Sequence, residues 1–255
     1  NATIFYMKKL SKLCLAIVVL AAVSAFVYIE HTVFSADCTH VVAKNGNDSN
    51  PGTESKPWKT IQKAADELTA GETVCIREGT YAEIVEPKNS GKKGAPITFK
   101  TYGSDEVNIT GKEGVYNILN IRGKDYIVVD GGTGKNLRFE YPYTINTSKT
   151  GANWTMLKIS WVAGHNIIRN CTIIREGDPS TFYKYQEGQT DGFSKYRDTG
   201  IGISGSTSKY NLVEGNTVRG MKIGIKVTDD AKYTTIRNNH IIDTIFHGVG
   251  GGGGT

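Results

Sequence analysis

The chain has 255 residues, of which 38% are hydrophobic and 22% are charged. This composition is ordinary for a water-soluble protein and excludes a protein with many membrane spans. Glycine is abundant, at 30 residues or roughly 12% against a usual ~7%, while only six prolines exclude collagen and proline-rich linkers. The 30 basic and 25 acidic residues give a net charge of +5, which is too small and too dispersed to indicate nucleic-acid binding.

The start of the chain has the pattern of a targeting segment. Three lysines (Lys8, Lys9 and Lys12) precede an uncharged run over residues 13–29, which predicts a secretory signal peptide at residues 7–36. Small residues at Val23-Ser24-Ala25 favour cleavage there, and Ala36 offers a second site. The alternative is an uncleaved signal anchor, because the apolar run approaches the ~20 residues that span a bilayer.

These limits define the expected domain. Residues 1–6 have the character of translated upstream sequence, so we expect one folded domain over residues 37–255, secreted or at the cell surface. A glycine run at residues 250–254 falls where a sequence repeat restarts, which predicts that the domain continues beyond the C-terminal residue. We expect a monomer with no membrane contact beyond the signal segment.

The sequence contains four cysteines, and Cys14 lies within the signal segment. Export permits disulfides, and Cys38 and Cys75 each adjoin an expected strand near the start of the domain, so we expect these two to pair. Cys171 is then left as a free thiol, and no CxxC motif indicates a zinc or redox site.

The domain begins with one expected helix and continues with short strands. Apolar residues recur at helical spacing over residues 58–68, between Pro57 and Gly71. Alternating or β-branched segments follow at residues 73–76, 97–99, 107–109, 118–121 and 126–129. One helix followed by many short strands indicates an all-β fold.

A sequence repeat specifies the kind of all-β fold. Residues 210–218 (YNLVEGNTV) align with residues 233–241 (YTTIRNNHI) at an offset of 23, and residues 165–173 (HNIIRNCTI) precede the first copy by 45, which we interpret as two repeats with one partly replaced by an insertion. Gly200, Gly224 and Gly248 begin similar segments every 24 residues. This period predicts a parallel β-helix, and the leucine pattern of a leucine-rich repeat is absent.

The alignment places equivalent residues in columns along the solenoid. Ile168, Val213 and Ile236 share a column that should face the core. Asn216 and Asn239 share another, in which their amides can bond to the turn backbones above and below. Cys171 occupies the same column, so we interpret it as a buried structural residue.

Several segments resemble a known superfamily. Residues 41–53 (VVAKNGNDSNPGT), 57–65 (PWKTIQKAA), 71–74 (GETV) and 79–81 (GTY) resemble the start of secreted right-handed β-helix proteins of the pectate-lyase-like superfamily. The resemblance covers residues 38–111 and the later repeats, and it implies that the early helix caps the open end of the solenoid. It does not fix the activity, because the superfamily includes lyases, hydrolases, epimerases and members without an assigned reaction.

The resemblance implies a possible chemistry. Lyases of this kind remove the proton α to a uronate carboxylate, with Lys or Arg as the base and calcium, held by Asp and Glu, as the cation that neutralises the carboxylate. Calcium is therefore the expected cofactor and an acidic polysaccharide the expected partner.

The 24-residue register selects Lys226 as the first candidate base. Ile225 and Val227 should point inward, so Lys226 should point outward between Gly202 and Gly250 of the neighbouring coils. A lysine between two glycines should have no side chains beside it, so a flat sugar ring could lie next to it on the sheet. The alternative is a solvated lysine on a strand.

Asp229 and Asp230 follow at the end of the same strand and could supply oxygens to calcium. Adjacent acids would raise the pKa of a lysine and weaken it as a base unless a metal takes up their charge. The alternative is a polar turn.

Residues 178–198 interrupt the repeat with aromatic and basic side chains that suit an anionic polysaccharide. The aromatic candidates are Tyr183, Tyr185, Phe193 and Tyr196, and the basic ones are Lys195 and Arg197. Residues 191–195 (DGFSK) resemble an acid-Gly-Phe…Lys stretch of one pectate lyase family, which would make Asp191 a calcium ligand and Lys195 the base. The spacing is one residue short, and the alternative is a loop that packs on its own aromatic rings.

A second insertion at residues 138–156 contains Trp154, which could form the other wall of a groove. We therefore favour a lyase that cleaves an acidic polysaccharide by β-elimination. A glycoside hydrolase would require converging carboxylates, for which Asp198 lies at the wrong end of its strand relative to Asp229 and Asp230. A non-catalytic protein that binds glycans on the solenoid face remains the third alternative.

Overall fold

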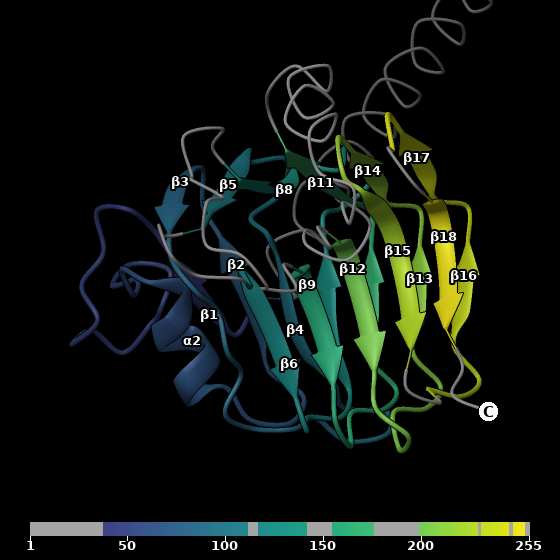
Figure 1. The fold of residues 1–255 in the computed structure, drawn as a ribbon. Coiled ribbons are helices and arrows are strands. Elements are labelled where there is room, and N and C mark those ends of the chain that lie inside the picture. Colours follow the sequence, from purple (N-terminus) through teal and green to yellow (C-terminus); the bar gives the residue numbers. More distant parts are fainter. Residues whose placement is uncertain are drawn as a thin grey trace, which may run out of the picture. The chain divides into compact units, whose positions relative to one another are not determined.

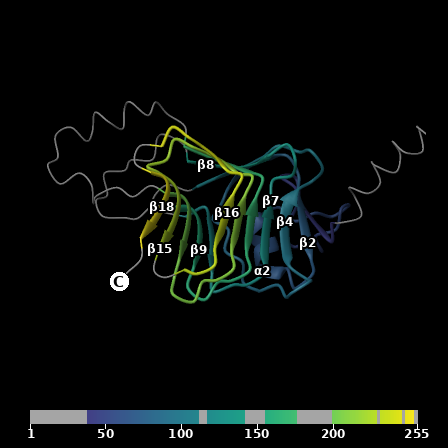
Figure 2. The same ribbon diagram turned by 90° about the vertical axis from the view of Figure 1, so that its right-hand side faces the viewer.

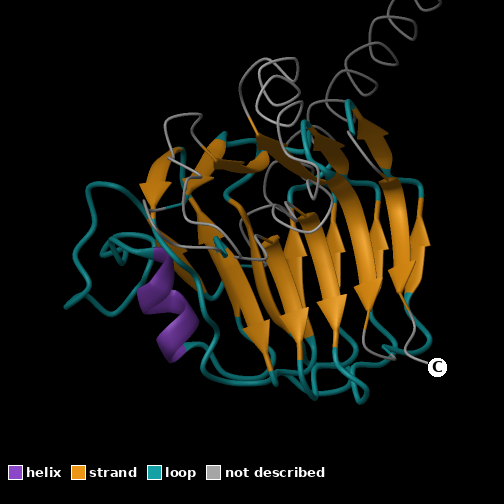
Figure 3. Cartoon of the chain, in the orientation of Figure 1, coloured by secondary structure: helices purple, strands orange, loops and turns teal. Residues whose placement is uncertain are grey.

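The computed structural model describes residues 38–111, 117–141, 155–175, 199–228, 231–244 and 247–252. Contacts divide the chain into two units, Asn1–Cys38 and Thr39–Thr255, and the elements below all belong to the second unit. Its strands form three parallel sheets, A, B and C (Figure 1). The described residues contain a single helix, α2, beside this array of strands (Figure 3).

Each sheet takes one strand from each successive coil. Sheet A has the order β1 (His40–Val42), β2 (Thr73–Ile76), β4 (Ile97–Thr101), β7 (Ile127–Asp130), β10 (Ile167–Arg169), β13 (Leu212–Glu214) and β16 (Thr235–Arg237). Sheet B has the order β3 (Gly79–Ala82), β5 (Val107–Thr110), β8 (Leu137–Tyr141), β11 (Cys171–Arg175), β14 (Thr217–Arg219) and β17 (His240–Ile242). Sheet C has the order β6 (Leu119–Arg122), β9 (Thr155–Ser160), β12 (Thr199–Ser204), β15 (Ile223–Thr228) and β18 (His247–Gly252).

The chain passes from sheet A to sheet B to sheet C and then returns to sheet A one coil further along. Figure 2 shows equivalent strands of successive coils side by side. Ile168 pairs with Val213, and Val213 with Ile236, as the repeat predicted. The predicted parallel β-helix is therefore confirmed.

The core fills the space between the three sheets. It is one continuous cluster of buried side chains from Val42 in β1 to Ile225 in β15. Ile168 and Val213 are fully buried, and Ile236 packs against the cluster, so the predicted inward column is confirmed.

The asparagine column is confirmed as well. The side-chain oxygen of Asn216 accepts from the backbone N–H of Cys171 at 3.0 Å, and that of Asn239 accepts from the backbone N–H of Asn216 at 3.0 Å. The Asn216 amide also donates to the carbonyl of Ile168 at 3.0 Å. Cys171 is a free, fully buried cysteine in the first position of this column.

The interpretation of the 45-residue offset was wrong. Ile168 pairs directly with Val213, so the two copies are consecutive coils rather than coils two repeats apart. Residues 176–198 lie between β11 and β12 of one coil and enlarge it, because a connection between two sheets can lengthen without disturbing the pairing of either strand.

The helix is shorter than predicted. Helix α2 spans Ile61–Glu67, because Thr60 is its N-cap and accepts a hydrogen bond from the N–H of Lys63 at 3.1 Å. Trp58 instead pairs with Val42 in an isolated parallel bridge, where its N–H donates to the carbonyl of Val41 at 3.0 Å. The expected apolar face is buried nevertheless, through Trp58, Ile61, Ala64, Ala65 and Leu68.

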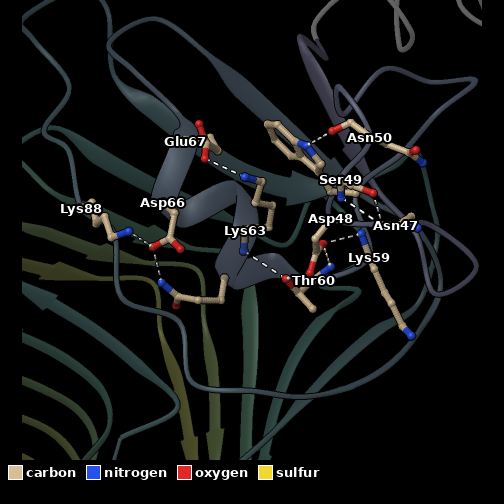
Figure 4. A network of polar contacts seen from close by, with 12 residues as sticks. Asn47, Asp48, Ser49, Asn50, Lys59, Thr60, Lys63, Asp66, Glu67 and Lys88 are labelled. Atoms are coloured by element: carbon tan, nitrogen blue, oxygen red, sulfur yellow. Dashed lines mark hydrogen bonds and ion pairs between the residues drawn. The ribbon is translucent and has the colours of Figure 1, made fainter.

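Polar contacts fix the loop that leads into this helix (Figure 4). Asp48 accepts from the N–H groups of Lys59 and Thr60 at 2.8 and 2.9 Å and from the Thr60 hydroxyl at 2.9 Å. Burial of Asp48 would raise its pKa, but the hydrogen bonds from Thr60 and Lys59 outweigh this effect and hold the pKa below its ordinary value. In Figure 1, α2 lies at the end of the sheets where β1 and β2 begin the solenoid.

Candidate functional site

The outer face of sheet C carries one row of residues that the register defines. Asn120 pairs with Lys158, Lys158 with Gly202, Gly202 with Lys226, and Lys226 with Gly250. We call this row the sheet C column. Successive rungs are one strand spacing apart, about 4.8 Å.

Lys226 has the predicted place in this column. Ile225 beside it is fully buried and Val227 packs against the core, whereas Lys226 is half-buried and projects from the other side of the strand. Its neighbours in the adjacent coils are Gly202 and Gly250. The predicted geometry of Lys226 is confirmed, and its catalytic role stays a prediction.

A side chain at Gly202, the residue paired with Lys226, would collide with Thr155. A Cβ atom there would lie 2.7 Å from Cγ2 of Thr155, well inside van der Waals contact. The side chain of Thr155 therefore covers part of the space over Gly202, next to Lys226.

The register adds a second lysine that the sequence analysis missed. Lys158 lies in the same column, two rungs from Lys226, so their Cα atoms are separated by about 10 Å. The backbone of Lys158 pairs within sheet C, whereas its side chain forms no hydrogen bond or ion pair in the described part of the chain. The same repeat could have identified Lys158. It lies 44 residues before Gly202, on the other side of the insertion at residues 176–198.

The column ends in a polar pair. The side-chain amide of Asn120 donates to Oε1 of Glu86 at 2.7 Å. Glu86 follows Val85, which pairs with Leu119, so it stands one coil before Asn120. This carboxylate lies at the start of the row, three rungs away from Gly202.

The remaining predicted site residues lie outside the described residues. They are Lys195, Arg197, Asp191, Asp229, Asp230, Tyr183, Tyr185, Phe193, Tyr196 and Trp154. In sequence, residues 176–198 join β11 to β12 and residues 142–154 join β8 to β9, so both segments join sheet B to sheet C in consecutive coils. In sequence, Asp229 directly follows Thr228, the last residue of β15.

Charges on the outer face of sheet A are largely matched. Arg169 pairs with Asp130 at 2.8 Å, and Arg237 pairs with Glu214 at 2.7 Å. Basic and acidic residues alternate in this register from Lys100 to Arg237. This face therefore offers little net charge to a charged polymer.

Sheet B carries an open hollow of about 510 Å³. Lys135 and Arg138 line it together with Glu106 and Glu140, so its charges balance. Arg138 contacts Glu140 at 3.0 Å, and the amide of Asn108 donates to the same carboxylate at 2.7 Å. Lys226, the predicted catalytic residue within the described ranges, is not among the residues that line this hollow.

The described residues contain no group of three or more His, Cys, Asp or Glu side chains suited to a metal. They also contain no helix long and apolar enough to cross a bilayer. Cys38 and Cys75 are both disulfide-bonded.

The fold and the column of outward residues define a parallel β-helix protein. The chain belongs to the DUF1565 family, described as "Protein of unknown function", which it matches over residues 44–250. It is 39% identical over 140 residues to "Uncharacterized protein YwoF" of Bacillus subtilis, which covers 51% of this chain and 30% of that protein.

Two further relatives carry the name pectate lyase. The chain is 36% identical over 74 residues to "Pectate lyase PEL9" of Emericella nidulans, which covers 28% of this chain and 18% of that protein. The crystal structure of pectate lyase Pel9A superposes with a TM-score of 0.50 and 19% identity, over 78% of this chain and 52% of that one. The chain thus spans less than a third of the curated relatives it matches, and the structural likeness shows the fold alone.

Proposed function

We propose that this protein is a secreted, carbohydrate-active β-helix protein that cleaves an acidic, uronate-containing polysaccharide by β-elimination. The observation that carries the proposal is the sheet C column, in which Lys158 and Lys226 project from one face with the glycine rung of Gly202 between them. The sequence relative named as a pectate lyase supports the same substrate class.

The spacing of the two lysines fits a polymer that lies across the strands. Two rungs amount to about 10 Å, roughly the length of a disaccharide unit. Gly202 adds no side chain of its own between the two lysines, and Thr155 lies over its backbone. An ammonium group at Lys158 would attract a carboxylate of a uronate chain.

The lysines take different roles in the proposed reaction. Lys226, in its amine form, takes the proton from the carbon next to the uronate carboxylate. The bond from the neighbouring ring carbon to the glycosidic oxygen then breaks, a carbon–carbon double bond forms, and the departing oxygen gains a proton. Lys158, as an ammonium, holds a carboxylate of an adjacent sugar and fixes the register of the chain.

Calcium remains a proposed cofactor. Asp229 and Asp230 follow Thr228 at the end of the strand that carries Lys226, and carboxylate oxygens are ligands that calcium takes. Asp191, in the segment between β11 and β12, is an alternative proposed ligand rather than a partner of this pair. When bound, calcium would neutralise the uronate carboxylate and so stabilise charge beside the carbon that loses its proton.

Elimination fits the described face better than hydrolysis does. A glycoside hydrolase needs two carboxyl groups that flank the scissile bond. The column from Asn120 to Gly250 in the described strands of sheet C carries no carboxylate, and Glu86, which accepts from Asn120, supplies one carboxylate rather than the required pair.

Elimination creates an unsaturated uronate end that absorbs in the near ultraviolet, whereas hydrolysis creates only reducing ends. We would incubate the protein with pectate, alginate and chondroitin, each with calcium or with a chelator. A rise in absorbance on one polymer is the expected result and identifies the substrate. New reducing ends without absorbance would indicate a hydrolase, and polymer binding without either product would indicate a glycan-binding protein.

A further inference from the structure

Trp161 is an unusual residue on the edge where the chain leaves sheet C. It directly follows β9, and 61% of its surface is exposed. Large aromatic side chains are normally buried, because they contribute 150 to 250 Å² of mostly apolar area. An exposed tryptophan on a rigid solenoid therefore requires an explanation.

The backbone of Trp161 is strained as well. Its φ is 68°, in the left-handed region that costs a residue with a side chain roughly 1–2 kcal/mol. The register of Arg122, Ser160 and Ser204 places Gly123 and Gly205 at the same position of the adjacent coils. These residues are both glycines with positive φ, 62° and 108°, so Trp161 stands where its neighbours use the residue that avoids the strain.

The glycines also place no side chain next to Trp161 at this position of the adjacent coils. A Cβ atom on Gly123 would meet nothing within 4 Å. At Gly205 it would lie only 2.9 Å from the carbonyl oxygen of Trp161, so this coil passes close to the Trp161 backbone without adding a side chain.

Other aromatic residues with positive φ are compensated by stacking. Tyr126, His165, Tyr210 and Tyr233 form one continuous stack, with ring centroids 4.7 to 5.2 Å apart. Trp161 has no aromatic partner of this kind in the described part of the chain. Its ring contact is with a cation.

That cation is Arg122, the last residue of β6. Its guanidinium carbon lies 3.9 Å from the centroid of the Trp161 ring, a cation–π contact. Arg122 is exposed, and no acidic side chain in the described ranges forms an ion pair with it. The indole thus holds the planar guanidinium in a fixed orientation with its donors available.

We propose that Arg122 and Trp161 form a binding subsite for one acidic sugar residue, distinct from the column of Lys158 and Lys226. The apolar C–H face of a pyranose ring packs on the exposed indole, and the sugar carboxylate accepts two parallel hydrogen bonds from the guanidinium. Arg122 pairs with Ser160, two residues beyond the pair of Asn120 and Lys158, so the subsite lies at the exit edge of the same sheet. The choice of ligand class rests on the proposed function.

The test is binding rather than turnover. Isothermal calorimetry on the full chain would use a uronate oligomer of the preferred polymer and the same oligomer with its carboxyl groups reduced to alcohols. Wild-type protein should bind the acidic oligomer at least about tenfold more tightly than the reduced one, because hydrogen bonds to charged groups are among the strong ones. Equal binding of both oligomers would overturn the assignment of an acidic ligand.

Two substitutions test the residues. Arg122→Gln should weaken binding of the acidic oligomer by about tenfold or more. Trp161→Gly should abolish most of the binding while the melting temperature stays unchanged or rises, since glycine relieves the strain at this φ. A structural tryptophan would behave in the opposite way, with a lower melting temperature and unchanged binding.

Lys59→Gln is the matched control, because it removes one exposed positive charge far in sequence from sheet C and should leave binding unchanged. Binding that survives both substitutions overturns the subsite, even if the protein cleaves its polymer. Binding that depends on both residues without any cleavage would refute the proposed reaction and leave the subsite intact. A wild-type protein that neither binds nor cleaves any of the acidic polymers would refute both.

Discussion

Replacement of Asn216 by alanine would test the polar column inside the solenoid. Asn216 is fully buried and joins three consecutive coils. Its oxygen accepts from the N–H of Cys171, and its amide donates to the carbonyl of Ile168 at 3.0 Å and to Oδ1 of Asn239 at 2.9 Å. Alanine would remove all three bonds at once.

The expected loss of stability follows from the buried polar groups that Asn216→Ala would leave without a hydrogen-bond partner. The Cys171 N–H and the Ile168 carbonyl are buried, and each buried polar group that loses its partner costs about 1–3 kcal/mol. The free energy of unfolding should therefore fall by about 2–6 kcal/mol, a large part of the ~5–15 kcal/mol that a typical domain possesses.

Urea denaturation followed by circular dichroism would measure this loss as a lower midpoint. Asn45→Ala is the matched control, because Asn45 is exposed and such surface changes usually stay within about 0.5 kcal/mol. A midpoint for Asn216→Ala equal to that of the control would show that the column does not stabilise the stacked coils, and would refute this account of the core.

Two further predictions concern ionisable groups. Cys171 is buried, and burial raises the pKa of its thiol. A thiol reagent should therefore modify Cys171 only at the rate at which the protein unfolds. Rapid modification of the native protein would contradict the buried position of Cys171. The pKa of Asp48 is lowered on folding, so this carboxylate stabilises the protein above its ordinary pKa of 3.8, and the contribution is lost as the pH falls through the lower folded value. Asp48→Asn should therefore lower the urea midpoint at neutral pH and approach wild type in acid, and a deficit independent of pH would contradict this sign.

Much of the fold could be predicted because a solenoid repeats its constraints. The columns of Ile168, Val213 and Ile236, and of Cys171 and Asn216, follow from short-range alignment alone, since each coil pairs in register with the next. The same alignment placed Lys226 between its two glycines.

The missed features have physical reasons. The helix was predicted too long because Trp58 is apolar at a helical spacing, although its backbone pairs with Val42 in a β-bridge. Lys158 was missed because the enlarged coil separates it from Gly202 by 44 residues, which hides a rung that is only one strand spacing away. Arg122 and Trp161 meet between adjacent coils at the ends of β6 and β9, two strands that the aligned repeats did not include.

The most direct test of the proposed reaction compares Lys226→Ala with wild-type protein on the preferred uronate polymer. Initial rates of the rise in near-ultraviolet absorbance would be measured, with circular dichroism to verify folding. We expect Lys226→Ala to lose at least ~100-fold in rate, the scale of a positioned general base, whereas Lys59→Gln keeps the wild-type rate. A folded Lys226→Ala protein that cleaves as fast as wild type would contradict the assignment of the base and, with it, the reaction proposed for the sheet C face.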